Sequence, residues 1–206
     1  MRMFWLAPVL LACCGNVDGM KERRATLDFV REAFTPSKVE GSLIEAERAN
    51  IPVALANTTR PLVMVEQPGL DLADFFVLAA RSGDIATYGS SSQASISFDG
   101  PVMVATRGFG ADLMSGDAGS LPDLLAARQS GQYKRVVRYL DGENQTISYP
   151  VQCNLEAGDK GTFVEYCGSP YQEFRNVFEL SKQGKVVTSI QWHGPDNSYL
   201  TIRRLR

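Results

Sequence analysis

Apolar and polar residues alternate along much of the chain after residue 60. The clearest case is ASISFD at 94–99, where every second residue is apolar. This period of two is typical of a strand with one buried face, and the Asp99-Gly100 pair favours a hairpin into a second strand at 101–106. Other segments with strand patterns are 62–66, 74–80, 85–88, 133–140, 145–154, 161–167, 173–180, 185–192 and 199–205. Because short turns separate most of these segments, the sequence predicts a mostly β fold with a large antiparallel meander.

Helical spacing of apolar residues is confined to shorter segments. Apolar residues three to four positions apart predict a short N-terminal helix over Met20–Phe34. Further short helices are expected over Gly41–Asn50, stopping before Pro52, and over Leu121–Gln129. The helices are therefore expected to be accessories to the sheet.

The first twelve residues have the layout of a secretory signal peptide. Arg2 supplies a positive charge, Met3–Ala12 are apolar, and the first acidic residue is Asp18. As a helix, this apolar run would span about 15 Å, which is half of the roughly 30 Å hydrocarbon core of a bilayer. We therefore expect residues 1–12 to be a signal peptide that is removed on export.

The apolar run ends in Leu10-Leu11-Ala12-Cys13, which matches a bacterial lipobox. The small residue before the cut suits the peptidase, and the Cys13 thiol would carry the lipid. Cys14 is a rival acceptor, and an ordinary secretory peptide is the alternative to lipidation. Two or more acyl chains hold a protein stably on a membrane. We expect a lipidated tether at 13–20 and a single β domain at 21–206, on the periplasmic side of the outer membrane because no Asp follows the lipidated cysteine.

Cys153 and Cys167 are the two cysteines of the domain itself. Export would place them in an oxidising compartment, where a disulfide is the default. A zinc site is the alternative, but it would need two more ligands, and the chain has one histidine, His193, and no C-x-x-C motif. The sequence therefore predicts a disulfide, with no metal and no cofactor.

Charge and loop motifs exclude two classes of ligand. The chain has 21 Lys and Arg against 23 Asp and Glu, with no basic patch, so nucleic acid is not an expected partner. The stretch TRGFGADLM at Thr106–Met114 contains a G-x-G, but Leu113 stands where a dinucleotide loop needs its third glycine. We interpret the stretch as a backbone turn that Arg107 ties down through an Asp.

A catalytic constellation is not apparent. His193 would have to be the base of any Ser-His-Asp triad, and the G-x-S-x-G motif is absent. We interpret His193 as a surface residue at a hairpin tip. Trp192 and Tyr199 are candidates for stacking on a sugar, although aromatic side chains on strands belong more often to the core.

Two stretches carry a resemblance to a known family. The first is ISFDGPVMVATRGFGADLMS at 96–115, and the second extends from Cys153 and Cys167 to SIQWHGPDNSYLTIRRL at 189–205. Together they resemble the YjbF-type lipoproteins, which include the capsule lipoprotein GfcB and are associated with exopolysaccharide and group 4 capsule production. Ser198 departs from the family pattern, which often has Gly before the Tyr.

The resemblance implies a sheet curled into a barrel-like shape. It also implies a non-enzymatic outer-membrane lipoprotein that supports exopolysaccharide or capsule export or assembly. The expected partners are the membrane, through the lipid anchor, and the polysaccharide export machinery or the polysaccharide itself. Arg107 and Asp112 either shape the motif or contact a glycan, as Trp192 and Tyr199 would. The alternatives are a lipid- or glycan-binding carrier module and a polysaccharide-modifying enzyme.

Overall fold

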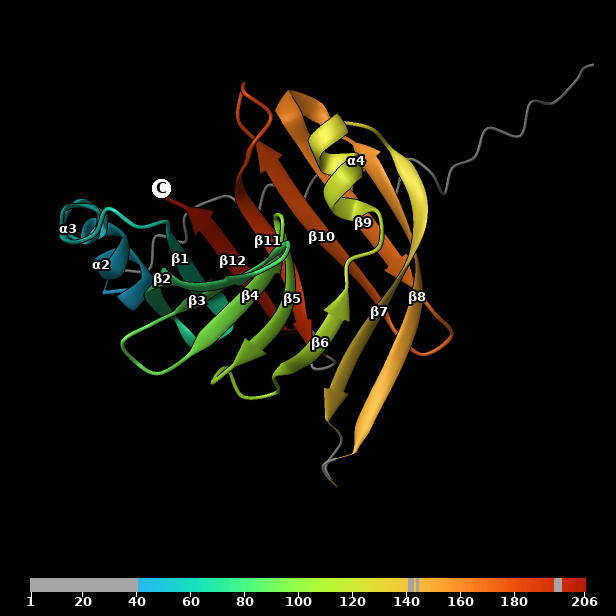
Figure 1. Cartoon of the computed structure of the whole chain (residues 1–206), viewed down its shortest axis with the longest axis horizontal. Coiled ribbons are helices and arrows are strands. Elements are labelled where there is room, and N and C mark those ends of the chain that lie inside the picture. The colour runs from blue at the N-terminus through green and yellow to red at the C-terminus, as the bar shows by residue number, and fades with distance from the viewer. Residues whose placement is uncertain (1–40, 141–142, 144, 195–197) are drawn as a thin grey trace, which may run out of the picture. The chain divides into compact units, whose positions relative to one another are not determined.

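The computed structural model describes residues 41–140, 143, 145–194 and 198–206, which belong to one compact unit, 38–206 (Figure 1). The predicted signal peptide, the lipid anchor at Cys13 and the helix expected over Met20–Phe34 lie outside the described residues. Among the described residues, the helices are all too short or too polar to cross a bilayer.

A curled sheet of twelve antiparallel strands makes up most of this unit (Figure 1). The strand order is β5-β4-β3-β2-β1-β12-β11-β10-β9-β8-β7-β6, so the chain follows a meander that β12 closes against β1. The fold class predicted from the sequence is confirmed. The strands are β1 (Leu62–Gln67), β2 (Leu72–Ser82), β3 (Ile85–Gly89), β4 (Ser95–Asp99), β5 (Val102–Arg107), β6 (Leu113–Asp117), β7 (Gly131–Leu140), β8 (Thr146–Ala157), β9 (Thr162–Gly168), β10 (Glu173–Leu180), β11 (Val186–Gly194) and β12 (Ser198–Arg204).

The barrel is nearly closed, with its seam between β5 and β6. These strands are consecutive in the chain and stand at opposite ends of the strand order, yet they lie side by side. Gly116 on β6 lies against β5 here, since a Cβ built on it would be in van der Waals contact with the Cα of Val104, at 3.5 Å. β11 supports the seam from inside the barrel, where the Gln191 amide accepts the N–H of Met103 at 2.8 Å and donates to the carbonyl of Pro101 at 2.9 Å. A side chain thereby satisfies backbone groups that an edge strand leaves unpaired.

In the part of the chain that the structure describes, two short helices precede the first strand, and the other helical segments lie in connections between strands. α2 (Leu43–Ala49) begins where Asp71 accepts the N–H of Leu43 at 2.9 Å, and it packs on β2. The expected end before Pro52 is correct for α2, but the chain then continues into α3 (Ile51–Asn57), which the sequence interpretation missed. A proline in the first turn of a helix costs no hydrogen bond, so Pro52 starts this helix. The remaining helices are α4 (Leu121–Ala127) and the short 3₁₀ turns η1 (Pro68–Leu70) and η2 (Asp159–Gly161).

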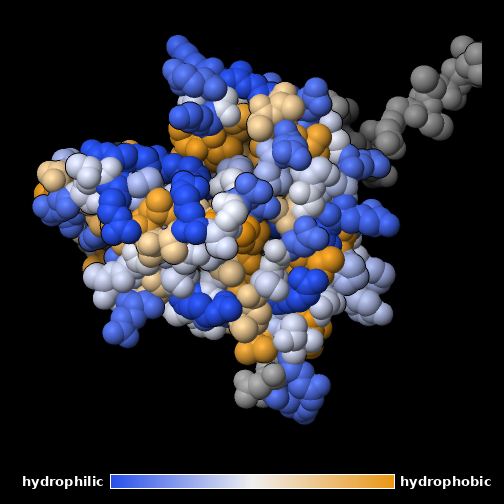
Figure 2. Space-filling model, viewed as in Figure 1, coloured by the Kyte–Doolittle hydropathy of each residue, from blue (hydrophilic) through white to orange (hydrophobic). Residues whose placement is uncertain are grey.

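Apolar side chains pack together inside the barrel. In Figure 2 hydrophilic residues predominate on the visible face and hydrophobic residues form smaller areas between them, which agrees with an inward apolar face. Most of the large side chains that are fully buried belong to one continuous cluster, among them Phe76, Ile96, Phe98, Met103, Leu113, Leu155, Phe178 and Leu200.

Candidate functional site

The turn Thr106–Met114, which joins β5 to β6, is organised around the carboxylate of Asp112. That carboxylate accepts the N–H of Gly108 at 2.8 Å and the N–H of Phe109 at 3.1 Å. It also accepts the Thr106 hydroxyl at 3.1 Å, and the same hydroxyl oxygen accepts the N–H of Leu113 at 2.9 Å. Asp112 therefore folds the turn back on itself and fixes the backbone of Phe109.

Arg107 ties down the turn through backbone carbonyls instead of through an Asp. Its guanidinium donates to the carbonyls of Leu113 at 3.1 Å and Met114 at 3.3 Å, and also to that of Thr106. The expectation that Arg107 pairs with an Asp is therefore wrong. Asp112 does not need a cation, because backbone N–H groups and a hydroxyl already serve as its donors.

The glycines of the turn are required by its geometry. Gly108 and Gly110 have φ values of +86° and +96°, a region that residues with side chains rarely adopt. A Cβ at Gly108 would also lie 3.2 Å from both the Cα and the Cβ of Ala94. The G-x-G is thus a backbone requirement of a tight turn packed on the β3–β4 connection.

His193 lies inside the barrel, which corrects its interpretation as a surface residue. It is 2 % exposed, and its Nε2 lies 3.0 Å from the Thr106 hydroxyl. The sequence interpretation ended the strand at Trp192, whereas β11 continues to Gly194 and carries His193 under the turn. Burial lowers the pKa of His193 and the Asp112 carboxylate opposes that shift, so the ring is neutral at pH 7. Since Thr106 donates its hydrogen to Asp112, His193 Nε2–H is the donor to Thr106.

An open recess of about 250 Å³ lies beside this turn, and we call it the rim pocket. Phe109 at its edge is half-buried; its ring stacks on that of Phe76, with centroids 5.7 Å apart and an angle of 18° between the planes. The ring of His193 lies 5.7 Å from that of Phe109. The pocket combines this apolar wall with polar side chains from β1, β2 and the β3–β4 connection. Its lining residues are Val65, Gln67, Leu72, Ala73, Asp74, Phe76, Ser92, Ala94, Gly108 and Phe109.

A second polar cluster is enclosed in the barrel around Glu165 on β9, which is 0 % exposed. Its carboxylate accepts Nη1 of Arg135 at 2.9 Å and 3.0 Å, the hydroxyl of Tyr133 at 2.7 Å, and the side-chain amide of Asn176. Burial works against the charge of Arg135, but Glu165 outweighs it and the pKa of Arg135 is raised. Asn176 also accepts the N–H of Trp192 at 2.6 Å. Because all of these donors bind the same carboxylate, the cluster is a structural ion pair. Its carboxylate has few acceptor positions left with which to bind a substrate or exchange a proton.

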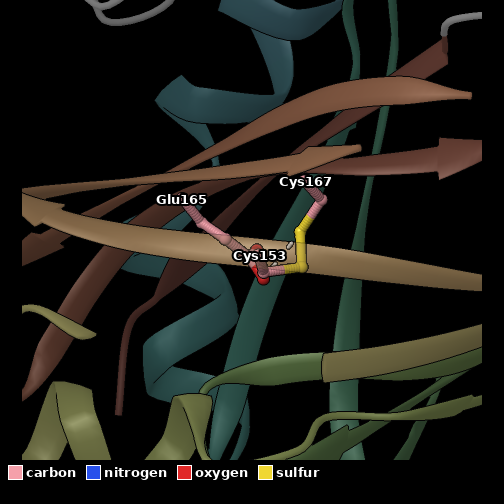
Figure 3. Close-up of side chains that lie close together, drawn as sticks. All are labelled: Cys153, Glu165 and Cys167. Atoms are coloured by element: carbon pink, nitrogen blue, oxygen red, sulfur yellow. Dashed lines mark hydrogen bonds between the residues drawn. A yellow bond between two sulfur atoms is a disulfide. The ribbon is translucent and has the colours of Figure 1, made fainter. Parts of the chain in front are cut away.

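Cys153 and Cys167 form a disulfide between directly opposed positions of β8 and β9, with Cα atoms 4.1 Å apart (Figure 3). The Glu165 carboxylate lies beside it, with Oε1 3.2 Å from the Cys167 sulfur. These three residues have ligand atoms within 4.8 Å of one another, which is a spacing that a metal could use. Both sulfurs are consumed by the disulfide and the carboxylate is neutralised by Arg135, so the arrangement fits a cross-link and disfavours the zinc alternative.

Trp192 and Tyr199 are packed against other aromatic side chains. Trp192 is buried, stacks on Phe174 with centroids 4.4 Å apart, and meets Tyr139 edge to face. Tyr199 is half-buried and its hydroxyl accepts the N–H of Arg175. Neither side chain lines the rim pocket. Phe109 is the aromatic side chain that meets solvent beside the pocket, and its place in the sequence, between two glycines, was the signal that could have identified it.

Two tyrosines on β7 provide a matched pair for measuring how much a hydrogen bond to Glu165 contributes to the stability of the fold. The hydroxyl of Tyr133 donates to Glu165, whereas the hydroxyl of Tyr139 is buried with no hydrogen-bond partner in the described part of the chain. We expect Tyr133→Phe to destabilise the fold by about 1.5–3 kcal/mol, because it removes a donor from a buried charge. Tyr139→Phe should be neutral or stabilising, because it removes a desolvated hydroxyl. Urea unfolding of the two variants would measure the difference, and equal losses would contradict these assignments.

Comparisons with known proteins were consistent with one another. Residues 37–205 match the family model described as group 4 capsule polysaccharide lipoprotein GfcB, YjbF. A solved structure, that of the hypothetical lipoprotein YmcC from Escherichia coli K12, has the same fold with a TM-score of 0.62 and 16 % sequence identity. The similarity covers 82 % of this chain and 97 % of that one. No curated protein sequence matches the chain.

Proposed function

Because the chain belongs to the family of group 4 capsule polysaccharide lipoproteins, we propose that it is an outer-membrane lipoprotein that supports exopolysaccharide or capsule export or assembly. The role is non-enzymatic: the protein binds or shelters polymer, or holds other components in place. The N-terminal sequence supports the location, because a signal peptide layout precedes the lipobox cysteine Cys13.

The single observation that carries the non-enzymatic role is how the acidic groups inside the fold are used. Glu165 is enclosed by Tyr133, Arg135 and Asn176. Catalysis by paired carboxylates needs two such groups facing a common substrate space, one of them free to exchange a proton. Glu165 faces the core of the barrel instead, and its hydrogen bonds stabilise the sheet.

The acidic group of the turn Thr106–Met114 is likewise occupied by hydrogen bonds that hold the fold. Asp112 is occupied by two backbone N–H groups and the Thr106 hydroxyl. His193 beneath it is buried and neutral, and it donates to the same hydroxyl. The residues that would be the first candidates for acid–base work therefore hold the turn together.

The alternative function, a lipid carrier, requires a cavity inside the barrel. A carrier of this shape needs an interior cavity lined by apolar side chains and not filled by them. The barrel interior instead contains a continuous packed cluster that includes Phe98, Phe178 and Trp192. This packed cluster favours action at the surface of the domain over transport of a lipid within it.

Changing Cys13 to Ala tests the anchored location and the role together. We expect the Cys13→Ala protein to lose lipid labelling, to accumulate as uncleaved precursor, and to fail to restore surface polysaccharide in a strain that lacks the chromosomal copy. Cys14→Ala is the matched control and should behave like the unchanged protein. Labelling that persists in Cys13→Ala but vanishes in Cys14→Ala would move the anchor to Cys14. Full restoration of polymer by an unlipidated protein would contradict a role at the membrane.

A further inference from the structure

We propose that the rim pocket binds one sugar ring of the exported polymer, with an apolar face of the ring against Phe109 and its hydroxyls on Asp74, Ser92 and Gln67. This inference rests on the proposed function and specifies where the protein would contact the polymer. The pocket combines the open recess of about 250 Å³ with an aromatic wall and polar side chains on its other walls.

The size of the pocket suits a single ring. Pockets that enclose drug-sized ligands occupy roughly 300–1,000 Å³. The rim pocket is below that range and open to solvent, so it can accept one residue of a polymer while the neighbouring residues continue outside. A site that grips one residue weakly also allows a chain to move on.

Phe109 supplies a rigid apolar platform. Its ring stacks on Phe76 and lies beside His193, while its backbone N–H is held by Asp112. The flanking Gly108 packs against Ala94 and adopts a conformation open mainly to glycine. A side chain that is already fixed in place loses little entropy on binding, which is the condition for useful affinity from a small contact. In this chain the turn Thr106–Met114 therefore presents one aromatic ring, that of Phe109, at the surface.

The polar walls match hydroxyl groups. The Asp74 carboxylate accepts the N–H of Phe75 at 2.7 Å and the hydroxyl of Ser92 at 2.8 Å, one on each oxygen. A carboxylate has about four acceptor positions, so each oxygen retains capacity for a sugar hydroxyl. Within the described residues, the Gln67 side chain makes no hydrogen bond, and its amide can both donate and accept. Leu72, which is 45 % exposed, extends the apolar side of the pocket.

The same polar groups argue against an acyl chain as the occupant. Under hydrocarbon, the Gln67 amide and the remaining acceptor positions of the Asp74 carboxylate would be buried without partners, at a cost of several kcal/mol. A sugar ring offers an apolar face to Phe109 and hydroxyls to the other walls, so it satisfies both kinds of surface at once. The chemistry of the lining thus selects a carbohydrate.

Saturation-transfer NMR on the detergent-solubilised full chain tests this assignment. The probes are the methyl glycosides of glucose, galactose, N-acetylglucosamine and glucuronic acid. We expect at least one of them to bind, with the strongest saturation on the ring C–H protons of one face. Phe109→Ala should weaken that binding by about tenfold, and Gln67→Ala by about three- to tenfold. Tyr171→Ala is the matched control, since Tyr171 is 87 % exposed and lies outside the pocket, and it should bind like the unchanged protein.

The outcomes separate this proposal from the proposed function. Unchanged binding in both Phe109→Ala and Gln67→Ala, or no binding of any probe, overturns the sugar site. Gln67→Ala keeps the test valid if Phe109→Ala fails to fold, because Gln67 is half-buried and supports no other side chain in the described structure. Failure of the proposed function would appear in cells, as normal polymer output without the protein, while binding of a glycoside to the purified chain could persist.

Discussion

Replacing Glu165 with Ala is expected to destabilise the fold by about 3–5 kcal/mol, the cost of leaving a buried charge without its partner. Arg135 is 4 % exposed, and its charge is balanced by Glu165 alone among the ion pairs of the described residues. The same change removes the acceptor of Tyr133 and of Asn176. Three donors would thus be left in the interior of the barrel, where water cannot easily replace the carboxylate.

Glu66→Ala is the matched control for this prediction. Glu66 is also buried, but its partners Arg48 and Arg203 have side chains 22 % and 26 % exposed, so they can be hydrated when the carboxylate is removed. We expect a clearly smaller loss, which urea unfolding would measure. The double change Arg135→Met with Glu165→Gln should recover much of the Glu165→Ala loss, because it removes the buried charges and keeps an acceptor. A loss of less than about 1 kcal/mol in Glu165→Ala would show that the ion pair does not hold the interior.

Removal of the disulfide is expected to cost about 3 kcal/mol. The two cysteines are 14 residues apart in the sequence, and closing a loop of about 15 residues is worth that amount in the chain-entropy model. The bond joins β8 to β9 next to Glu165, so its loss also loosens the strands that carry the buried cluster.

The measurement is thermal unfolding of the oxidised protein against the double variant Cys153→Ala/Cys167→Ala. A reductant should lower the melting temperature of the unchanged protein toward that of the variant and should leave the variant itself unaffected. A reductant that shifts both proteins equally would mean that the effect does not come from this bond.

Sequence patterns were sufficient for most of the sheet because most strands carry their own signal of alternating apolar residues. Alternation in 94–99 and the Asp99-Gly100 turn led directly to β4 and the hairpin that follows it. β6 was missed because Leu113–Asp117 is short and largely polar, with a glycine in its interior. Its strand conformation comes from pairing with β7, where Leu113 lies opposite Tyr139. Pairing between distant segments is a tertiary effect that local propensity does not contain.

The candidate site was accessible to sequence analysis only in part. The turn and its glycines could be interpreted locally, because the hydrogen bonds of Asp112 span at most six residues. The contact of His193 with Thr106 bridges 87 residues and crosses the barrel, so the local pattern alone places this solitary histidine at a surface turn. Glu165 was hidden for the same reason: its partners come from β7 and β10, and nothing within its own strand indicates that its charge is paired.

The quantity and covalent structure of the polymer made without this protein distinguish a non-enzymatic role in export from an enzymatic one. Surface and secreted polysaccharide should be measured in a deletion strain and in its complemented parent, together with the sugar precursors inside the cell and the repeat unit of the residual polymer by NMR. A non-enzymatic role in export predicts less polymer, continued precursor synthesis and an unchanged repeat unit with unchanged substituents. Normal output of unchanged polymer would contradict a role in export. Polymer of normal quantity with an altered linkage or substituent would indicate an enzyme.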